Sequence, residues 1–313
     1  MMQTEPSSKH PPHSIRSRPV DVLLTPLIAC SLIISFQVRA QTENVAITRY
    51  DNSLEIFHPV RASGGMVATE QRLATEVGAE ILRQGGNAID AAVAVGFALA
   101  VVLPNAGNLG GGGFMLIRNA KNGETQALDF RETAPSAAKR DMFLDQQGNV
   151  IAGKSTRTPY SVAVPGTVAG LTYAARTHGS LPLEKLVAPA IKLAEDGFIV
   201  SNVLAQQFSL QRSHLERWPS TREVFFKRKP DSPDCLLADC PSASLQTYAA
   251  GERLLQPDLG RTLRHIAYLG AEGFYKGSVA QSIVETLSTS TRPMTQEDLA
   301  NYKIAVRQPV KGL

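Results

Sequence analysis

Residues 85–131 read GGNAIDAAVAVGFALAVVLPNAGNLGGGGFMLIRNAKNGETQALDFR, and the rest of the chain is organised around them. Asn87 is a good helix N-cap, and the carboxylate of Asp90 suits the free backbone N–H groups of the first turn. Residues 91–103 then carry no polar side chain, and Pro104 ends the run. Because a bilayer span needs about twenty apolar residues, the run is too short to cross a membrane. We therefore expect a helix that is buried on all sides and packed against a sheet.

Four consecutive glycines, Gly110–Gly113, follow this helix. Residues without Cβ allow positive φ and a close approach of another backbone or a ligand. No Gly-Lys-Ser/Thr follows, so the run lacks the lysine and hydroxyl of a phosphate loop. The glycines also precede a strand and do not link a strand to a helix, which argues against a dinucleotide fingerprint. We interpret them as a tight backbone crossing beneath a site.

Two strands are predicted after the glycines, at 114–118 and 125–131, joined by a hairpin loop that contains Asn122-Gly123. Side chains alternate along a strand, so Asp129 and Arg131 share one face, and Glu132 is next in the chain. These two carboxylates would orient a guanidinium fork that could bind a substrate carboxylate. On spacing alone, an ordinary ion pair at a strand end is the simpler interpretation.

The rest of the chain gives a mixed pattern of helices and short strands. The patterns predict strands at 66–68, at 161–164 and around 304–306, and helices at about 69–84, 167–178, 183–195, 259–267, 279–287 and after the capping pair Thr295 and Asp298. Thr167 opens a predicted helix, where an internal threonine is usually a cap and not a nucleophile. Residues 201–250 give no clear pattern.

Composition limits the class of protein. Hydrophobic residues make up 43% of the 313 residues and charged residues 19%, which is typical of a globular chain. The formal net charge is +4, but residues 1–40 hold four basic and two acidic side chains, which leaves +2 for residues 41–313. No nucleic-acid partner is therefore indicated.

The first forty residues have the pattern of an export signal. Arg16 and Arg18 precede an apolar stretch over 22–36, and Val38-Arg39-Ala40 forms a small-residue site. We expect cleavage after Ala40, a periplasmic or secreted protein, and no stable membrane span once the signal is removed. Lipid attachment at Cys30, within the sequence LIAC, is the alternative.

Cys235 and Cys240 are the two cysteines that remain after residue 40. In an oxidising compartment they could close a small disulfide loop. Two thiols without a nearby histidine are a poor metal site, so we expect no metal.

Several motifs together resemble one family. They are GGNAIDAA (85–92), GNLGGGGF (107–114), DFRETAP (129–135), PGTVAG (165–170), LAEDGF (193–198), FYKG (274–277) and DLANY (298–302). The chain resembles the large subunit of bacterial gamma-glutamyltransferases, the glutathione hydrolases, over about residues 58–310. The resemblance implies an α+β fold of the N-terminal-nucleophile hydrolase type, a four-layer αββα sandwich, made as a precursor that cuts itself into two subunits.

The resemblance also implies the chemistry and the site. In this family the N-terminal threonine of the small subunit attacks the gamma-glutamyl amide of glutathione, and the acyl group passes to water or to an amino acid or peptide, without metal or organic cofactor. Arg131 falls on the arginine that binds the α-carboxylate of the glutamyl group, and Glu132 helps to position it. The resemblance thus reverses the preference for an ordinary ion pair at Arg131.

The nucleophile is the main departure from the family pattern. We expect it beyond residue 313, so residues 41–313 would be an incomplete large-subunit region with no catalytic residue and no activity alone. The expected partners are the small subunit and small gamma-glutamyl substrates. The alternatives are a relative of the beta-lactam acylases, which favour glutaryl substrates, and a non-catalytic remnant that retains ligand binding.

Overall fold

The computed structural model describes residues 61–288, 294–310 and 312. The predicted export signal over residues 1–40, its cleavage after Ala40 and the alternative lipid site at Cys30 lie outside the described residues. Among those that are described, none of the helices has both the length and the apolar character that a membrane span requires.

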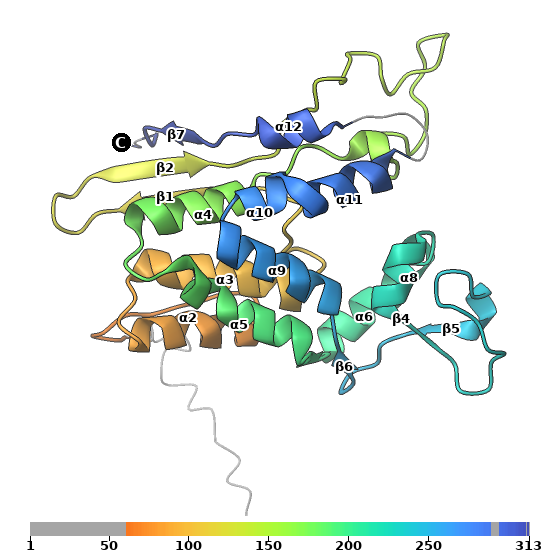
Figure 1. The fold of residues 1–313 in the computed structure, drawn as a ribbon, viewed down its shortest axis with the longest axis horizontal. Coiled ribbons are helices and arrows are strands. Elements are labelled where there is room, and N and C mark those ends of the chain that lie inside the picture. The colour runs from red at the N-terminus through yellow and green to blue at the C-terminus, as the bar shows by residue number, and fades with distance from the viewer. Residues whose placement is uncertain (1–60, 289–293, 311, 313) are drawn as a thin grey trace, which may run out of the picture. The chain divides into compact units, whose positions relative to one another are not determined.

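The described chain combines helices with short antiparallel sheets, which confirms the α+β class (Figure 1). The longer helices are α2 (Arg72–Arg83), α3 (Ala88–Val102), α4 (Thr167–His178), α5 (Leu183–Glu195), α9 (Pro257–Leu269) and α11 (Gly277–Leu287). The shorter ones are α6 (Asn202–Leu210), α7 (Arg212–Leu215), α8 (Pro219–Phe225), α10 (Glu272–Tyr275) and α12 (Gln296–Ala300).

Helix α3 is the centre of the core, as the unbroken apolar run predicts. Ten of its residues are buried, and Phe97 is fully so. Its neighbours are α2, α5 and α4. A Cβ at Gly96 would lie 2.8 Å from the side chain of Leu171 in α4, so the glycine permits this close packing.

The start of α3 is tied to a distant loop. The predicted capping box of Asn87 and Asp90 is present. The fully buried carboxylate of Asp90 also accepts hydrogen bonds from the backbone N–H of Ser180 and Leu181, at 2.9 and 3.2 Å, and from Ser180 Oγ at 2.6 Å. Burial raises the pKa of Asp90, but these hydrogen bonds outweigh it and hold the pKa below its ordinary value.

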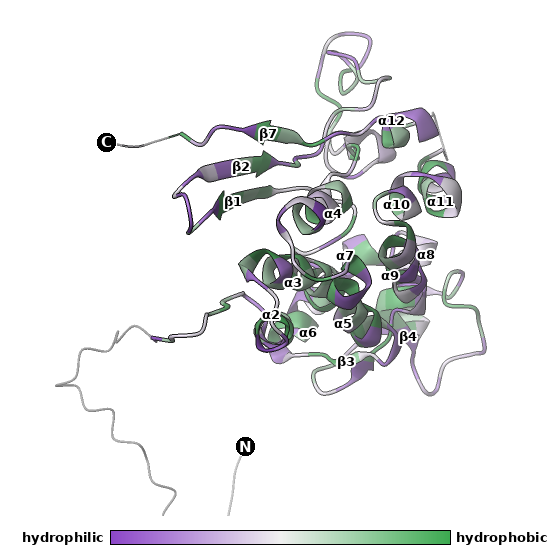
Figure 2. Ribbon diagram, turned by 60° about the vertical axis from the view of Figure 1, so that its left-hand side comes forward, coloured by the Kyte–Doolittle hydropathy of each residue, from purple (hydrophilic) through white to green (hydrophobic). Residues whose placement is uncertain are grey.

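The largest sheet joins three antiparallel strands in the order β1 (Phe114–Arg118), β2 (Thr125–Asp129), β7 (Ala305–Arg307). In both views the helices lie on one side of this sheet (Figures 1 and 2). Ile117 and Leu128 are buried on the helical side, whereas Phe114 and Leu116 on the other side are 67% and 70% exposed. The sheet therefore has one packed face and one open face within the described part of the chain.

Four local predictions were wrong. Residues 66–68 form no strand, and residues 161–164 form only a 3-10 turn over Pro159–Ser161 and a single bridge from Val164 to Thr133. Helix α4 begins at Thr167, but its N-cap is Gly166, so Thr167 is not the cap. Strand β2 ends at Asp129, although Phe130 still exchanges two backbone hydrogen bonds with Gly113.

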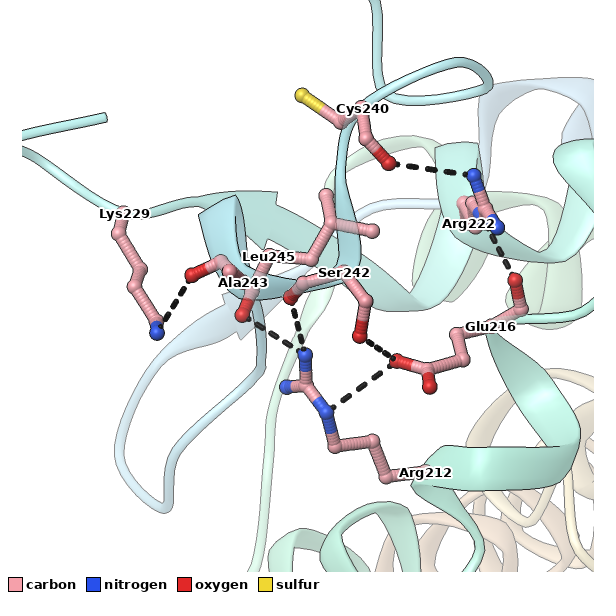
Figure 3. A network of polar contacts seen from close by, with 8 residues as sticks. All are labelled: Arg212, Glu216, Arg222, Lys229, Cys240, Ser242, Ala243 and Leu245. Atoms are coloured by element: carbon pink, nitrogen blue, oxygen red, sulfur yellow. Dashed lines mark hydrogen bonds and ion pairs between the residues drawn. The ribbon is translucent and has the colours of Figure 1, made fainter. Parts of the chain in front are cut away.

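Residues 201–250 gave no clear pattern in the sequence. Leu204 and Phe208 join the main core, whereas residues 226–247 pack around a small cluster of Phe226, Cys240 and Leu245, and we call this second part the subdomain. Strands β4 (Phe226–Arg228) and β5 (Leu245–Thr247) pair, and the predicted disulfide joins Cys235 to Cys240. Figure 3 shows the polar network beside it: the Arg212 guanidinium donates to the carbonyls of Ser242 and Leu245 at 2.8 and 3.0 Å. Two further short strands, β3 (Phe198–Ile199) and β6 (Arg253–Leu254), connect this subdomain to the core.

Candidate functional site

The glycine run is a tight backbone crossing, as predicted. A Cβ at Gly112 would lie 2.5 Å from the carbonyl oxygen of Phe130 and 2.8 Å from the backbone nitrogen of Glu132. The carbonyl of Gly111 accepts N–H groups from Gly166 and Thr167 at the start of α4, at 2.8 and 3.0 Å. Only residues without a side chain fit between the end of β2 and the start of α4.

Arg131 lies between Phe130 and Glu132, the two residues whose backbone approaches Gly112, and its side chain is 62% exposed. Its Nε is 3.1 Å from Oε2 of Glu132, and its guanidinium carbon is 6.0 Å from the centre of the Phe114 ring. Within the part of the chain that the structure describes, neither Nη atom has a hydrogen-bond partner. The outer edge of the guanidinium can therefore bind a planar anion by donating two parallel hydrogen bonds to it.

Glu132 is the carboxylate that contacts this guanidinium. Its Oε2 atom is buried, and a Cβ at Gly112 would lie 2.9 Å from it. The contact with Arg131 Nε is within ion-pair distance, but its geometry does not meet the criteria of a hydrogen bond. Glu132 therefore holds the inner side of the guanidinium mainly by charge.

Asp129 does not contact the Arg131 side chain, which corrects the predicted arrangement of an arginine between two carboxylates. Its Oδ1 accepts the backbone N–H of Arg131 at 3.1 Å, and its Oδ2 accepts Nε of Arg307 from β7 at 2.7 Å. The bond from the Arg131 N–H, followed by that from Arg307, lowers the pKa of Asp129.

Tyr302 is a site residue that sequence reasoning missed. Its hydroxyl donates a hydrogen bond to the backbone carbonyl of Arg131 at 2.8 Å, across 171 positions in the chain. Its ring stacks on that of Tyr275 with 5.7 Å between centroids and 5° between planes. The DLANY motif contains this tyrosine, but nothing in its local spacing indicates a contact with Arg131.

Metal-ligand groups and cavities among the described residues do not point to a second site. No group of three histidine, cysteine, aspartate or glutamate side chains among them could hold a metal ion. A cavity of about 980 Å³ is lined by α4, the end of α9 and residues 302–304, among others, and Arg131 is not among its lining residues.

Comparison with known proteins supplies an independent test. The family model described as gamma-glutamyltranspeptidase matches residues 74–312. The glutathione hydrolase proenzyme of Escherichia coli (strain K12) is 46% identical over 259 residues, which are 82% of this chain and 42% of that protein. The proenzyme of Bacillus subtilis (strain 168) is 39% identical over 249 residues, 79% of this chain and 40% of that protein. The chain thus spans about two fifths of the length of these relatives.

Solved structures agree with the sequence comparisons. The gamma-glutamyltranspeptidase of Helicobacter pylori superposes with a TM-score of 0.73 at 43% identity, over 80% of this chain and 68% of that one. The Bacillus anthracis transpeptidase CapD gives 0.62 at 32% identity, over 80% and 73% of the two chains. A cephalosporin acylase from Bacillus halodurans gives 0.60 at 27% identity, over 82% and 46%. These matches confirm the predicted fold class, the N-terminal-nucleophile hydrolase type.

Proposed function

The chain belongs to the gamma-glutamyltranspeptidase family, and from that premise we propose that it is the N-terminal part of a glutathione hydrolase precursor. The reaction is cleavage of the gamma-glutamyl amide of glutathione. The acyl group passes to a threonine of the small subunit and then to water or to the amine of an amino acid or peptide. No metal or organic cofactor takes part in this proposal.

The exposed guanidinium of Arg131 is the observation that carries the proposal. Its outer edge is open, while Glu132 and the Phe114 ring restrict its orientation. The α-carboxylate of a gamma-glutamyl group is a planar anion that matches this edge. A bidentate, charge-assisted contact of this kind contributes about 1.5–3 kcal/mol to binding. Arg131 therefore recognises the amino-acid end of the donor, and Glu132 positions it.

The chemical step belongs to a partner subunit in this proposal. The threonine hydroxyl attacks the amide carbonyl while the α-amine of the same threonine takes its proton. The C–N bond then breaks, the amine product leaves with a proton, and water or an acceptor amine cleaves the resulting ester. Arg131 contributes by holding the carbonyl carbon at a constant distance from the nucleophile.

The open face of the largest sheet supports the same partner. Phe114 and Leu116 expose apolar side chains on this face. A sheet face that carries large apolar side chains is normally packed against another layer of secondary structure. We propose that a second sheet from the small subunit covers this face and completes the four-layer αββα sandwich. The proposal places the protein in the periplasm or outside the cell, with the signal over residues 1–40 removed after Ala40.

The test uses the precursor with whatever coding sequence continues in frame beyond Leu313, or is supplied by an adjacent frame. We expect it to release 4-nitroaniline from gamma-glutamyl-4-nitroanilide, whereas residues 41–313 alone release none. Turnover by residues 41–313 alone would contradict the placement of the nucleophile. Absence of both a continuation and an adjacent frame would support the non-catalytic alternative.

Two variants test the role of Arg131 itself. Arg131→Gln removes the charge and the fork, so we expect KM for the gamma-glutamyl anilide to rise about 10- to 100-fold. Arg72→Gln, at a side chain that is 82% exposed on α2, is the matched control and should leave KM unchanged. Faster turnover of glutaryl-4-nitroanilide than of the gamma-glutamyl compound would support the acylase alternative instead.

A further inference from the structure

We propose that Tyr302 is a positioning residue for Arg131: by holding the backbone carbonyl of that residue, it fixes the point from which the guanidinium reaches the donor carboxylate. The inference rests on the proposed function of Arg131. It adds the hydrogen bond that orients this side chain toward donors with an α-carboxylate. Tyr302 itself does not touch the donor.

The hydrogen bond from Tyr302 to Arg131 has a fixed direction. The phenol oxygen is 2.8 Å from the carbonyl oxygen, which can only accept. Burial, together with the negative charges of Asp129 and Glu132, raises the pKa of the Tyr302 phenol to about 12. The phenol thus keeps its proton at neutral and moderately alkaline pH, and it donates to the carbonyl throughout that range.

The Tyr302 ring is itself held in place. It lies parallel to the Tyr275 ring, and the buried Tyr275 hydroxyl donates to the carbonyl of Pro165 at 2.8 Å. The same hydroxyl accepts the backbone N–H of Ala169 at 3.3 Å. Tyr275 is therefore anchored at the first turn of α4, and Tyr302 is fixed to that anchor by stacking.

The Tyr302 hydroxyl lies close to the first residue before α4, Gly166. A Cβ at Gly166 would collide with the carbonyl oxygen of Phe130 and with the Tyr302 hydroxyl. The N–H of Gly166 is bound to Gly111 in the glycine crossing. The Tyr302 hydroxyl, which binds the Arg131 carbonyl, thus lies beside the start of α4 and the glycine crossing.

The backbone N–H of Arg131 is also linked, through Asp129, to the C-terminal segment that contains Tyr302. This N–H donates to Asp129, which is in turn bound by Arg307, five residues after Tyr302. Both peptide groups of Arg131 are therefore restrained before a donor binds. Such restraint lowers the cost of orienting the guanidinium on binding, so its loss should weaken recognition of the α-carboxylate more than the chemical step.

The test is Tyr302→Phe in the full-length precursor, with two donors. One is gamma-glutamyl-4-nitroanilide, and the other is 4-aminobutanoyl-4-nitroanilide, which lacks the α-carboxylate. We expect Tyr302→Phe to raise KM for the first donor about three- to tenfold with kcat changed less than twofold, and to leave the second donor unchanged. The ratio of kcat/KM for the two donors falls by the same factor. Because both donors are measured on one preparation, this ratio does not depend on the fraction of folded or matured enzyme.

Tyr268→Phe is the matched control, since its side chain in α9 is 82% exposed, and it should leave the ratio unchanged. An equal loss for both donors with Tyr302→Phe would show a merely structural tyrosine and overturn the inference, as would an unchanged ratio. Arg131→Gln separates the two levels of the argument. If it removes the preference for the carboxylate while Tyr302→Phe does not, only the role of Tyr302 fails. If Arg131→Gln leaves the preference intact, the proposed function fails, and the inference with it.

Discussion

The carboxylate of Asp129 in β2 accepts a hydrogen bond at 2.7 Å from Nε of Arg307 in β7, and not from the side chain of Arg131 two residues further on. The two side chains lie on the open face of the sheet, diagonally across neighbouring strands. Because Arg307 satisfies Asp129, the Arg131 guanidinium keeps Glu132 as its one carboxylate contact among the described residues. The outer edge of the Arg131 guanidinium has no protein partner among the described residues.

Replacing Arg307 tests this relationship. Arg307→Gln removes the cation that binds Asp129, so the Asp129 carboxylate becomes free to attract the Arg131 side chain. We expect KM for the gamma-glutamyl anilide to rise at least about two- to fivefold in the full-length precursor, which is the range of an exposed ion pair, because the small subunit is proposed to cover this face and so to reduce its screening by water. Arg261→Gln, at an exposed ion pair on α9, is the control. An unchanged KM would mean that Asp129 and Arg307 stabilise the sheet without affecting Arg131.

Adding a methyl group at Gly166 should destabilise the fold. The backbone φ of −117° is open to alanine, so the conflict is steric: the new Cβ meets Phe130 and Tyr302. Overpacking of this kind costs about 1–3 kcal/mol or more. We expect Gly166→Ala to lower the urea midpoint of unfolding accordingly. Gly64→Ala, where a Cβ meets nothing within 4 Å, should leave the midpoint unchanged. Equal midpoints for the two variants would contradict the tight crossing.

The buried carboxylate of Asp90 should make stability depend on pH. Its pKa is lower in the folded than in the unfolded chain, so its contribution is present above the unfolded value of about 4 and is lost as pH falls through the folded value. We expect Asp90→Asn to reduce the free energy of unfolding by about 1–3 kcal/mol near pH 7, and by less near pH 3. Urea unfolding at both pH values measures this. Asp258→Asn on the exposed surface of α9 is the control, and a deficit that stays constant with pH would argue against an ionised Asp90.

The disulfide between Cys235 and Cys240 should stabilise one subdomain and not the core. Closing so short a loop contributes about 2 kcal/mol by the chain-entropy argument. Arg222 also donates to the carbonyls of Ala238 and Cys240, at 2.9 and 3.3 Å, and these contacts do not involve the two sulfur atoms. We expect the double variant Cys235→Ser, Cys240→Ser to speed amide hydrogen exchange in residues 226–247 and to leave α2–α5 unchanged. Reduced wild-type protein should behave like the variant. Faster exchange in α3 would contradict the separation of the subdomain from the core.

Local signals in the sequence were sufficient for much of the core. The capping box of Asn87 and Asp90, the buried helix α3 and the β1–β2 hairpin each depend on residues within 15 positions of one another. The strand predicted at 161–164 does not form, because only Val164 is paired, in a single bridge to Thr133, and no further backbone pairs follow it among the described residues. Strand propensity describes a side chain, whereas a strand exists only where another backbone lies beside it.

Long-range contacts decided the surroundings of Arg131. The identity and position of that arginine, and the glycine crossing beneath it, follow from the motifs 107–114 and 129–135. Its restraints come from Tyr302 and, through Asp129, from Arg307, whose contacts span 171 and 178 positions of the chain. A motif specifies which groups are available over a few residues. Which distant donor meets which acceptor depends on how the helices and the sheet pack, and that packing is the sum of many small apolar contacts that no single segment contains.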